Sequence, residues 1–93
     1  MNYDLCFRGG QIATSEGVFR ADIGVRDGRI VALAEELEGT ASETIDASGL
    51  LVLPGGVDSH VHIDQPSPGP SEMCDDFDTA SASAAAGGTT TVI

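Results

Sequence analysis

The sequence predicts a small antiparallel β-sheet of the sandwich type over residues 1–53, followed by one β/α unit over residues 54–93. Two observations predict this order. The first half contains short alternating runs of apolar and polar residues separated by glycine-containing turns, which is typical of antiparallel strands. The second half has an apolar strand, a proline-rich stretch, an alanine-rich stretch and a β-branched end, which indicates a strand, loop, helix and strand.

The first predicted strand covers residues 3–7, where Tyr3, Leu5 and Phe7 alternate with less apolar neighbours. This period of two is expected of a strand with one buried face. We expect the strand to end at Gly9-Gly10, because paired glycines interrupt regular structure.

A hairpin is predicted next. Asp27-Gly28 stands between the apolar run over 23–25 and Ile30, and a two-residue Asp-Gly turn is a strong hairpin signal. The acidic run over 35–38 is expected to be a solvated loop, after which residues 45–47 return to the sheet.

The predicted domain boundary lies near Pro54. Residues 50–53 are continuously apolar and predict a further strand, which Pro54-Gly55-Gly56 then interrupts. We therefore expect the chain to pass from the sheet to the second unit at this point.

The second unit is predicted from prolines and alanines. Pro66, Pro68 and Pro70 predict a loop, whereas the alanine-rich residues 80–86 predict a helix that ends at Gly87. Three acids before this helix suit its positively polarised start better than they suit catalysis: Asp75, Asp76 and Asp78.

Residues 89–93 are all β-branched and predict a second strand, parallel to the one that carries the histidines. The sequence stops there without a turn or a polar tail. We accordingly interpret it as the amino-terminal portion of a larger enzyme.

The two histidines of the chain, His60 and His62, are two residues apart. In a strand this spacing places both imidazoles on one face, with Val57 and Val61 packed on the other. Two imidazoles held side by side can share one divalent metal ion. The alternative, two ordinary surface histidines, is less favoured because an apolar strand, a Pro-Gly-Gly break and Asp58 surround them.

Composition excludes several classes of function. The chain is 41% hydrophobic and has a formal net charge of −11, so it fits a globular protein that does not attract nucleic acid or anionic membranes. It shows no targeting segment and no transmembrane helix. Cys6 and Cys74 form no disulfide or metal-binding pattern, which predicts a cytoplasmic protein.

The run from Leu53 to Pro66 resembles the first metal-binding motif of the amidohydrolase superfamily, and most of all that of dihydropyrimidinases and hydantoinases. Residues 75–79 and 84–93 are similar to the helix and second barrel strand of those enzymes. The resemblance extends over essentially the whole sequence.

This resemblance implies a two-lobed protein, in which a β-sandwich built from both chain ends accompanies a (β/α)8 barrel. It also implies a binuclear site, usually of zinc, with His60 and His62 on the more buried ion, and a homo-oligomer when complete. The family's other ligands are a carboxylated lysine, two further histidines and an aspartate. The family's proton-shuttling aspartate also lies on a later strand, so no catalytic residue falls within this sequence.

The remaining ligands are absent from these 93 residues, because all 4 basic residues are arginines and there are only 2 histidines. A complete barrel also needs about 250 residues. We therefore expect these residues alone to bind metal weakly and to be inactive. The expected partners are the remainder of the enzyme or homologous subunits.

The resemblance implies hydrolysis of a cyclic amide, either a dihydropyrimidine or a 5-substituted hydantoin. Asp58 is a candidate for a residue that orients a ligating imidazole; the alternative is that it is a structural aspartate. Asp64 and Gln65 are candidates for the substrate-side loop. Dihydroorotases carry arginine at the position of Asp64, where it pairs with a substrate carboxylate, so an acid here favours a neutral ring. Three alternatives remain open. The protein can be an allantoinase, a dihydroorotase-like cyclic amidohydrolase, or a non-catalytic assembly protein that resembles dihydropyrimidinases.

Overall fold

The computed structural model describes residues 2–66, 69 and 72–93. The chain divides into two compact units, the first ending at Pro54 and the second starting at Gly55. Within the described residues no helix is long and apolar enough to cross a membrane.

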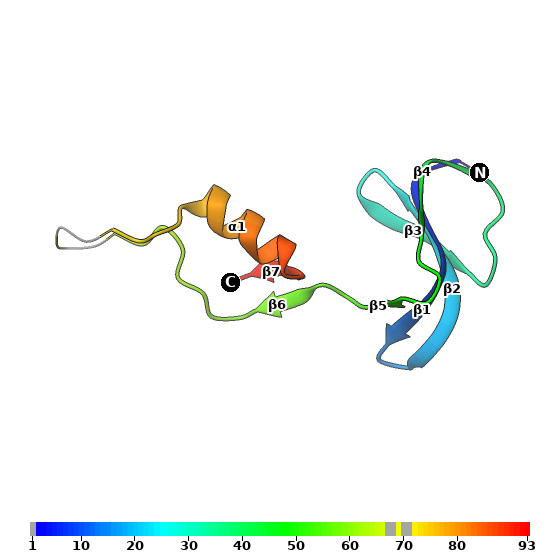
Figure 1. The fold of residues 1–93 in the computed structure, drawn as a ribbon, viewed down its shortest axis with the longest axis horizontal. Helices are drawn as coiled ribbons and strands as arrows, with labels where there is room; N and C mark the ends of the chain where they lie inside the picture. Colours follow the sequence, from blue (N-terminus) through cyan, green and yellow to red (C-terminus); the bar gives the residue numbers. More distant parts are fainter. Residues whose placement is uncertain (1, 67–68, 70–71) are drawn as a thin grey trace. The chain divides into compact units, whose positions relative to one another are not determined.

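A five-stranded sheet makes up the first unit (Figure 1). Four strands follow the order β3-β2-β1-β4, and a short fifth strand also pairs with β1. The strands are β1 (Asn2–Thr14), β2 (Gly17–Arg26), β3 (Arg29–Ala34), β4 (Thr40–Asp46) and β5 (Leu51–Val52).

The sheet is mixed, so the prediction of a purely antiparallel sheet was wrong. β1 is antiparallel to β2 but parallel to β4 and β5. The reason lies in the connection over 35–39, which carries the chain from β3 at one edge to β4 on the far side of β1. The acidic run over 35–38 forms part of this loop, as predicted.

The predicted hairpin is confirmed. Arg26 pairs with Arg29, which leaves Asp27 and Gly28 as a two-residue turn. Their φ angles of 51° and 72° are both positive, as a type I′ turn requires. Glycine adopts this conformation without steric cost, which explains its position here.

Gly9-Gly10 does not end the first strand, contrary to prediction. β1 continues to Thr14, and the pairing with β2 shifts register between Phe7 and Gly10. Gly9 has a φ of 77° and donates its N–H to Oδ1 of Asp22, at 2.9 Å. The glycine pair therefore forms a bulge within a long strand.

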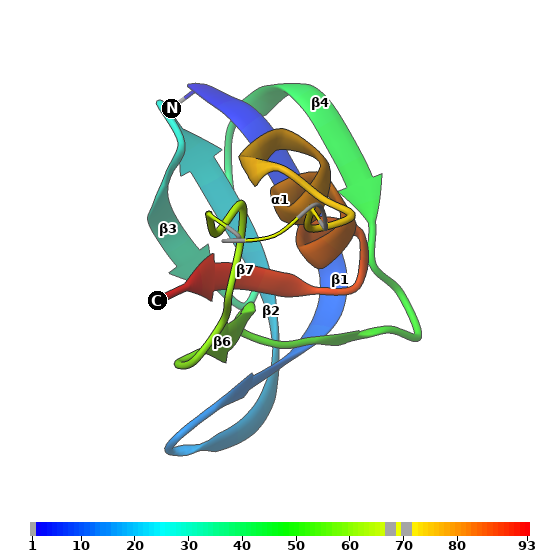
Figure 2. The ribbon, with the colours of Figure 1, turned by 90° about the vertical axis from the view of Figure 1, so that its left-hand side faces the viewer.

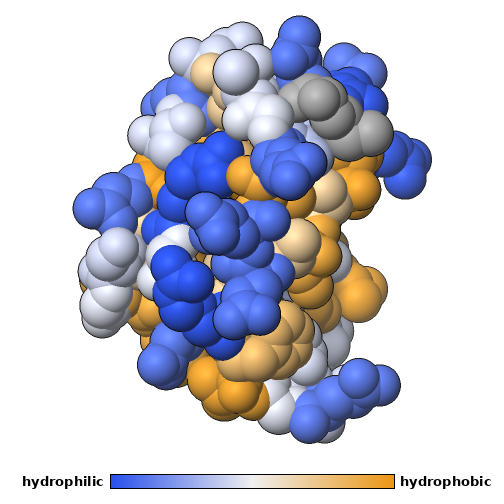
Figure 3. All heavy atoms as spheres, turned by 90° about the vertical axis from the view of Figure 1, so that its right-hand side faces the viewer, coloured by the Kyte–Doolittle hydropathy of each residue, from blue (hydrophilic) through white to orange (hydrophobic). Residues whose placement is uncertain are grey.

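The core of the first unit is small. Ile12, Ala21 and Ile23 are buried together, and three half-buried side chains pack on them: Phe7, Val25 and Val52. Figure 3 shows hydrophobic residues beside a band of hydrophilic ones on one face of the molecule. The predicted strand over 50–53 is reduced to Leu51–Val52, and Leu53 remains 62% exposed.

Asp22 is the buried charge of this sheet, and it accepts hydrogen bonds from two backbone N–H groups, those of Gly9 and Leu37. Arg8 forms an ion pair with it at 3.2 Å and also donates to the carbonyl of Leu37 at 3.0 Å. Burial alone raises the pKa of Asp22, but the two N–H donors and the nearby arginines outweigh it and lower the pKa. The carboxylate thus ties the bulge of β1 to the loop after β3.

The second unit contains β6 (Gly56–Asp58), α1 (Phe77–Ala86) and β7 (Thr89–Val92). β6 and β7 are parallel, as the sequence predicted for the two strands of this half. In Figures 1 and 2 α1 lies along β7. Pro68 and Pro70, which predicted a loop, lie outside the described residues.

The predicted helix is confirmed and begins at Phe77, because Asp76 caps it. Oδ1 of Asp76 accepts the N–H of Thr79 at 2.9 Å, and Oγ1 of Thr79 accepts the N–H of Asp76 at 3.1 Å. These reciprocal bonds satisfy two N–H groups of the first turn. Gly87 ends the helix, as expected.

Candidate metal centre

The two histidines follow β6 and do not lie within a strand. β6 ends at Asp58, and a bend occupies Ser59 and His60. The prediction that the strand carries the histidines was therefore wrong. The expectation that Val57 packs on the opposite face also fails within this chain, because Val57 is 64% exposed.

Hydrogen bonds to the end of β7 explain the bend. Ile93 donates its N–H to the carbonyl of Asp58 at 2.9 Å, and its own carbonyl accepts the N–H of Val61 at 3.2 Å. In a regular parallel ladder that carbonyl would accept the N–H of His60, one residue earlier. One extra residue is thus inserted before the histidines.

Because of this insertion, the backbone N–H of His60 is not bonded to β7, and the side chain of Asp58 accepts it instead. Its Oδ1 accepts the backbone N–H of His60 at 3.1 Å. Through this bond Asp58 holds the backbone of His60, whereas sequence reasoning considered its contact with an imidazole ring. The bulge could not be foreseen, because a regular strand also places the two histidines on one face.

The imidazole rings of His60 and His62 converge despite the bend. Their Nε2 atoms are 3.1 Å apart, and their ring centroids are 5.2 Å apart with the planes tilted by 45°. Two nitrogen ligands of one tetrahedral zinc, each bound at 2.0–2.1 Å, stand about 3.3–3.4 Å apart. The two donor atoms therefore fit a single divalent ion of this size.

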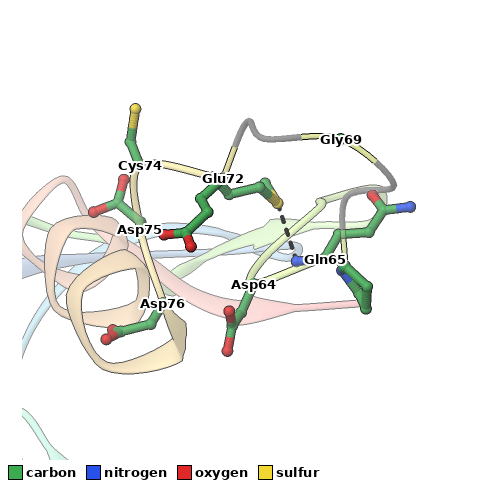
Figure 4. A pocket seen from close by; sticks show the side chains of 9 residues that line it. Asp64, Gln65, Gly69, Glu72, Cys74, Asp75 and Asp76 are labelled. Carbon is green, nitrogen blue, oxygen red and sulfur yellow. Dashed lines mark hydrogen bonds between the residues drawn. The ribbon is translucent and has the colours of Figure 1, made fainter.

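Gln65 completes the immediate surroundings of His62. Its Oε1 lies 2.7 Å from Nδ1 of His62, on the side of the ring away from His60. The backbone turns at Asp64, whose φ is 49°, and the N–H of Gln65 contacts Sδ of Met73 at 3.0 Å (Figure 4). Asp64 itself contributes the turn, and Figure 4 shows its carboxylate directed away from the side chain of Gln65.

Both histidines are exposed. Among the described residues, no third histidine, cysteine, aspartate or glutamate lies close enough to bind the same metal ion. Two imidazole nitrogens are fewer than the ligands that a stable zinc site requires. Any metal bound here needs further ligands.

Beside the loop that holds Gln65 lies an open hollow of about 620 Å³. Figure 4 shows four carboxylates at its wall, those of Asp64, Glu72, Asp75 and Asp76. A second hollow of about 580 Å³ reaches His62 and is lined on its other side by apolar residues of α1 and β7. The surface near the histidines is thus largely acidic, with apolar side chains contributed by α1 and β7.

Comparison with known proteins identifies what these features resemble. The chain is 43% identical to a D-hydantoinase of Ralstonia pickettii over 90 residues, which cover 97% of this chain and 19% of that protein. It is 47% identical to an allantoinase of Desulfitobacterium hafniense strain Y51 over 87 residues, or 94% of this chain and 19% of that protein. No family model matches.

Solved structures agree with the sequence matches. A D-hydantoinase structure superposes with a TM-score of 0.86 at 43% identity, covering 96% of this chain and 19% of the other. The family resemblance is confirmed: the chain is similar over nearly its whole length to hydantoinase-like amidohydrolases. An L-hydantoinase (dihydropyrimidinase) from Arthrobacter aurescens gives a TM-score of 0.81 at 38% identity, covering 97% of this chain and 20% of the other.

This hydantoinase-like chain spans about a fifth of the length of the curated relatives that it matches. Its first unit is mostly β-strand, as in the amino-terminal β-sandwich of hydantoinases.

Proposed function

We propose that the protein containing this chain is a metal-dependent hydrolase that opens a cyclic amide ring, either a dihydropyrimidine or a 5-substituted hydantoin. The observation that carries the proposal is the pair of Nε2 atoms 3.1 Å apart on His60 and His62. Similarity to proteins named hydantoinase and allantoinase supports the same reaction class.

In this proposal His60 and His62 hold a divalent ion, most simply zinc, as part of a binuclear site. Such an ion supplies hydroxide at neutral pH and polarises the carbonyl group under attack. The chain's own contribution is positional: Asp58 fixes the backbone of His60, and Gln65 contacts the ring of His62. The remaining ligands and the proton-shuttling acid belong to later segments of a complete protein.

We also propose that β6, α1 and β7 begin a (β/α)8 barrel, and that the five-stranded sheet is one part of a sandwich. Two parallel strands joined through a helix are the repeating unit of such a barrel. In barrel enzymes the chemistry takes place at the carboxyl ends of the strands, and the histidines directly follow the carboxyl end of β6. A cytoplasmic homo-oligomer remains the proposed form of the complete protein.

The acidic hollow favours a neutral substrate ring. Four carboxylates line it, and like charges repel a substrate carboxylate. This disfavours a dihydroorotase-like activity. Allantoin hydrolysis is the second candidate function, because an allantoinase matches the chain at 47% identity.

The proposal is tested on the protein as its cells produce it. Metal content and hydrolysis of hydantoin, dihydrouracil and allantoin are measured for the parent, His60→Ala and His62→Ala. Both variants are expected to lose most activity and bound metal, whereas Arg29→Ala, which alters an exposed side chain of β3, keeps both. Unchanged turnover and metal content in the histidine variants would show that the metal-binding role is assigned wrongly, whereas absence of turnover in the parent would favour a non-catalytic assembly role.

A further inference from the structure

We propose that Gln65 is a positioning residue for metal binding, because its side-chain carbonyl selects the tautomer of His62 in which Nε2 is free to bind metal. This inference rests on the proposed function. It gives Gln65 a role in addition to the substrate-side loop that the sequence predicts for it.

The first step is the identity of the proton donor. Oε1 of Gln65 lies 2.7 Å from Nδ1 of His62, and a carbonyl oxygen can only accept a hydrogen bond. Nδ1 of His62 must therefore carry the hydrogen. A neutral imidazole with its hydrogen on Nδ1 has its lone pair on Nε2.

The second step concerns where that lone pair points. Nε2 of His62 lies 3.1 Å from Nε2 of His60. With the hydrogen of His62 on Nδ1, His60 donates its Nε2–H to this lone pair, so His60 and His62 hold opposite tautomers. His62 is already in the metal-binding form, whereas His60 has to move its hydrogen to Nδ1 before it can bind.

The third step is the anchoring of Gln65. The preceding residue, Asp64, adopts a left-handed φ of 49°, which turns the chain back after His62. The N–H of Gln65 contacts Sδ of Met73 at 3.0 Å, which links this turn to the segment before α1 (Figure 4). The backbone of Gln65 is thus fixed at the point from which its side chain reaches His62.

The experiment compares the protein as its cells produce it with three variants after removal of metal. Gln65→Ala removes the acceptor, Gln65→Glu keeps an oxygen acceptor, and Gln11→Ala makes the same change in an exposed side chain of β1. Zinc affinity is measured by competition with a chelator. We expect Gln65→Ala to weaken it by about 10- to 100-fold and the other two to stay near the parent value.

A second readout is independent of metal. Nitrogen-15 NMR of labelled histidine, with His62 assigned through His62→Ala, reports the tautomer of the metal-free protein. The Nδ1–H form is expected in the parent and in Gln65→Glu, and a mixture in Gln65→Ala. Unchanged zinc affinity in Gln65→Ala, or an unchanged tautomer, would overturn the proposal. Absence of zinc binding by the parent would instead refute the proposed function, while the tautomer still tests the contact.

Discussion

The ring of Tyr3 lies directly over Gly24, so that a β-carbon built on Gly24 would stand 2.6 Å from Cε1 of Tyr3. Tyr3 is only 5% exposed, and the guanidinium of Arg26 stands 5.7 Å from its ring centroid. The absence of a side chain at Gly24 is thus what allows the aromatic ring to close over the sheet.

Gly24→Ala is accordingly expected to lower the free energy of unfolding by about 1–3 kcal/mol, because overpacking displaces the ring or the strand. Urea unfolding measures the change. In a Tyr3→Leu background the same substitution should cost clearly less. Equal costs in both backgrounds would mean that the ring is not the obstacle.

Asp22 predicts a pH dependence of stability. Its pKa is lowered in the folded state, so its contribution is complete above the unfolded pKa of about 4 and is lost as pH falls through the folded value. Asp22→Asn is expected to cost about 1–3 kcal/mol at pH 7 and to flatten the loss of stability in acid. Urea unfolding at pH 7 and pH 3 checks this, and parallel pH profiles for the parent and variant would contradict it.

The capping bond of Asp76 predicts local protection of α1. Hydrogen bonds from the N–H and hydroxyl of Thr79 lower the pKa of Asp76, so the cap persists below the ordinary range of an aspartate. Asp76→Ala should speed amide exchange at Thr79 by about 2- to 30-fold. Asp78→Ala is the matched control, because Asp78 lies in the same turn but does not cap the helix. Equal effects of both variants would indicate that charge, rather than the cap, stabilises the turn.

Asp58 predicts a difference between two substitutions in the complete protein. Asp58→Asn keeps a side-chain oxygen for the N–H of His60, whereas Asp58→Ala leaves this N–H to water. The loss of one such bond corresponds to about 2- to 10-fold. We expect metal affinity to fall by this factor in Asp58→Ala and to change less in Asp58→Asn. Equal losses of metal affinity in Asp58→Asn and Asp58→Ala would assign the role to the negative charge, which both variants remove.

Local sequence signals predicted the turns and helix ends, although the glycine pair at Gly9-Gly10 did not end its strand. Asp27-Gly28 predicted its turn correctly, because this dipeptide tolerates the two positive φ angles that the turn requires. Asp76 and Gly87 predicted the two ends of α1. Pairing between distant segments was not predictable in the same way. The parallel partner of β1 is β4, and no local residue pattern records that choice.

The candidate site shows the same division. The sequence alone predicted that the imidazole rings of His60 and His62 lie side by side. The insertion at Ser59 and His60 depends on hydrogen bonds to Ile93, more than thirty residues away in the chain. The contact of Gln65 with His62 depends on the left-handed turn at Asp64, which aspartate permits but does not require.

The central place of β1 has a consequence for the order of folding. β1 leaves the ribosome before its parallel partners, and Asn2 pairs with Thr40, which is synthesised 38 residues later. The local β1–β2–β3 meander can form early, because short loops close quickly. Until β4 and β5 emerge from the ribosome, one edge of β1 stays open to other strands, so pairing with a strand of another chain is a hazard of this stage.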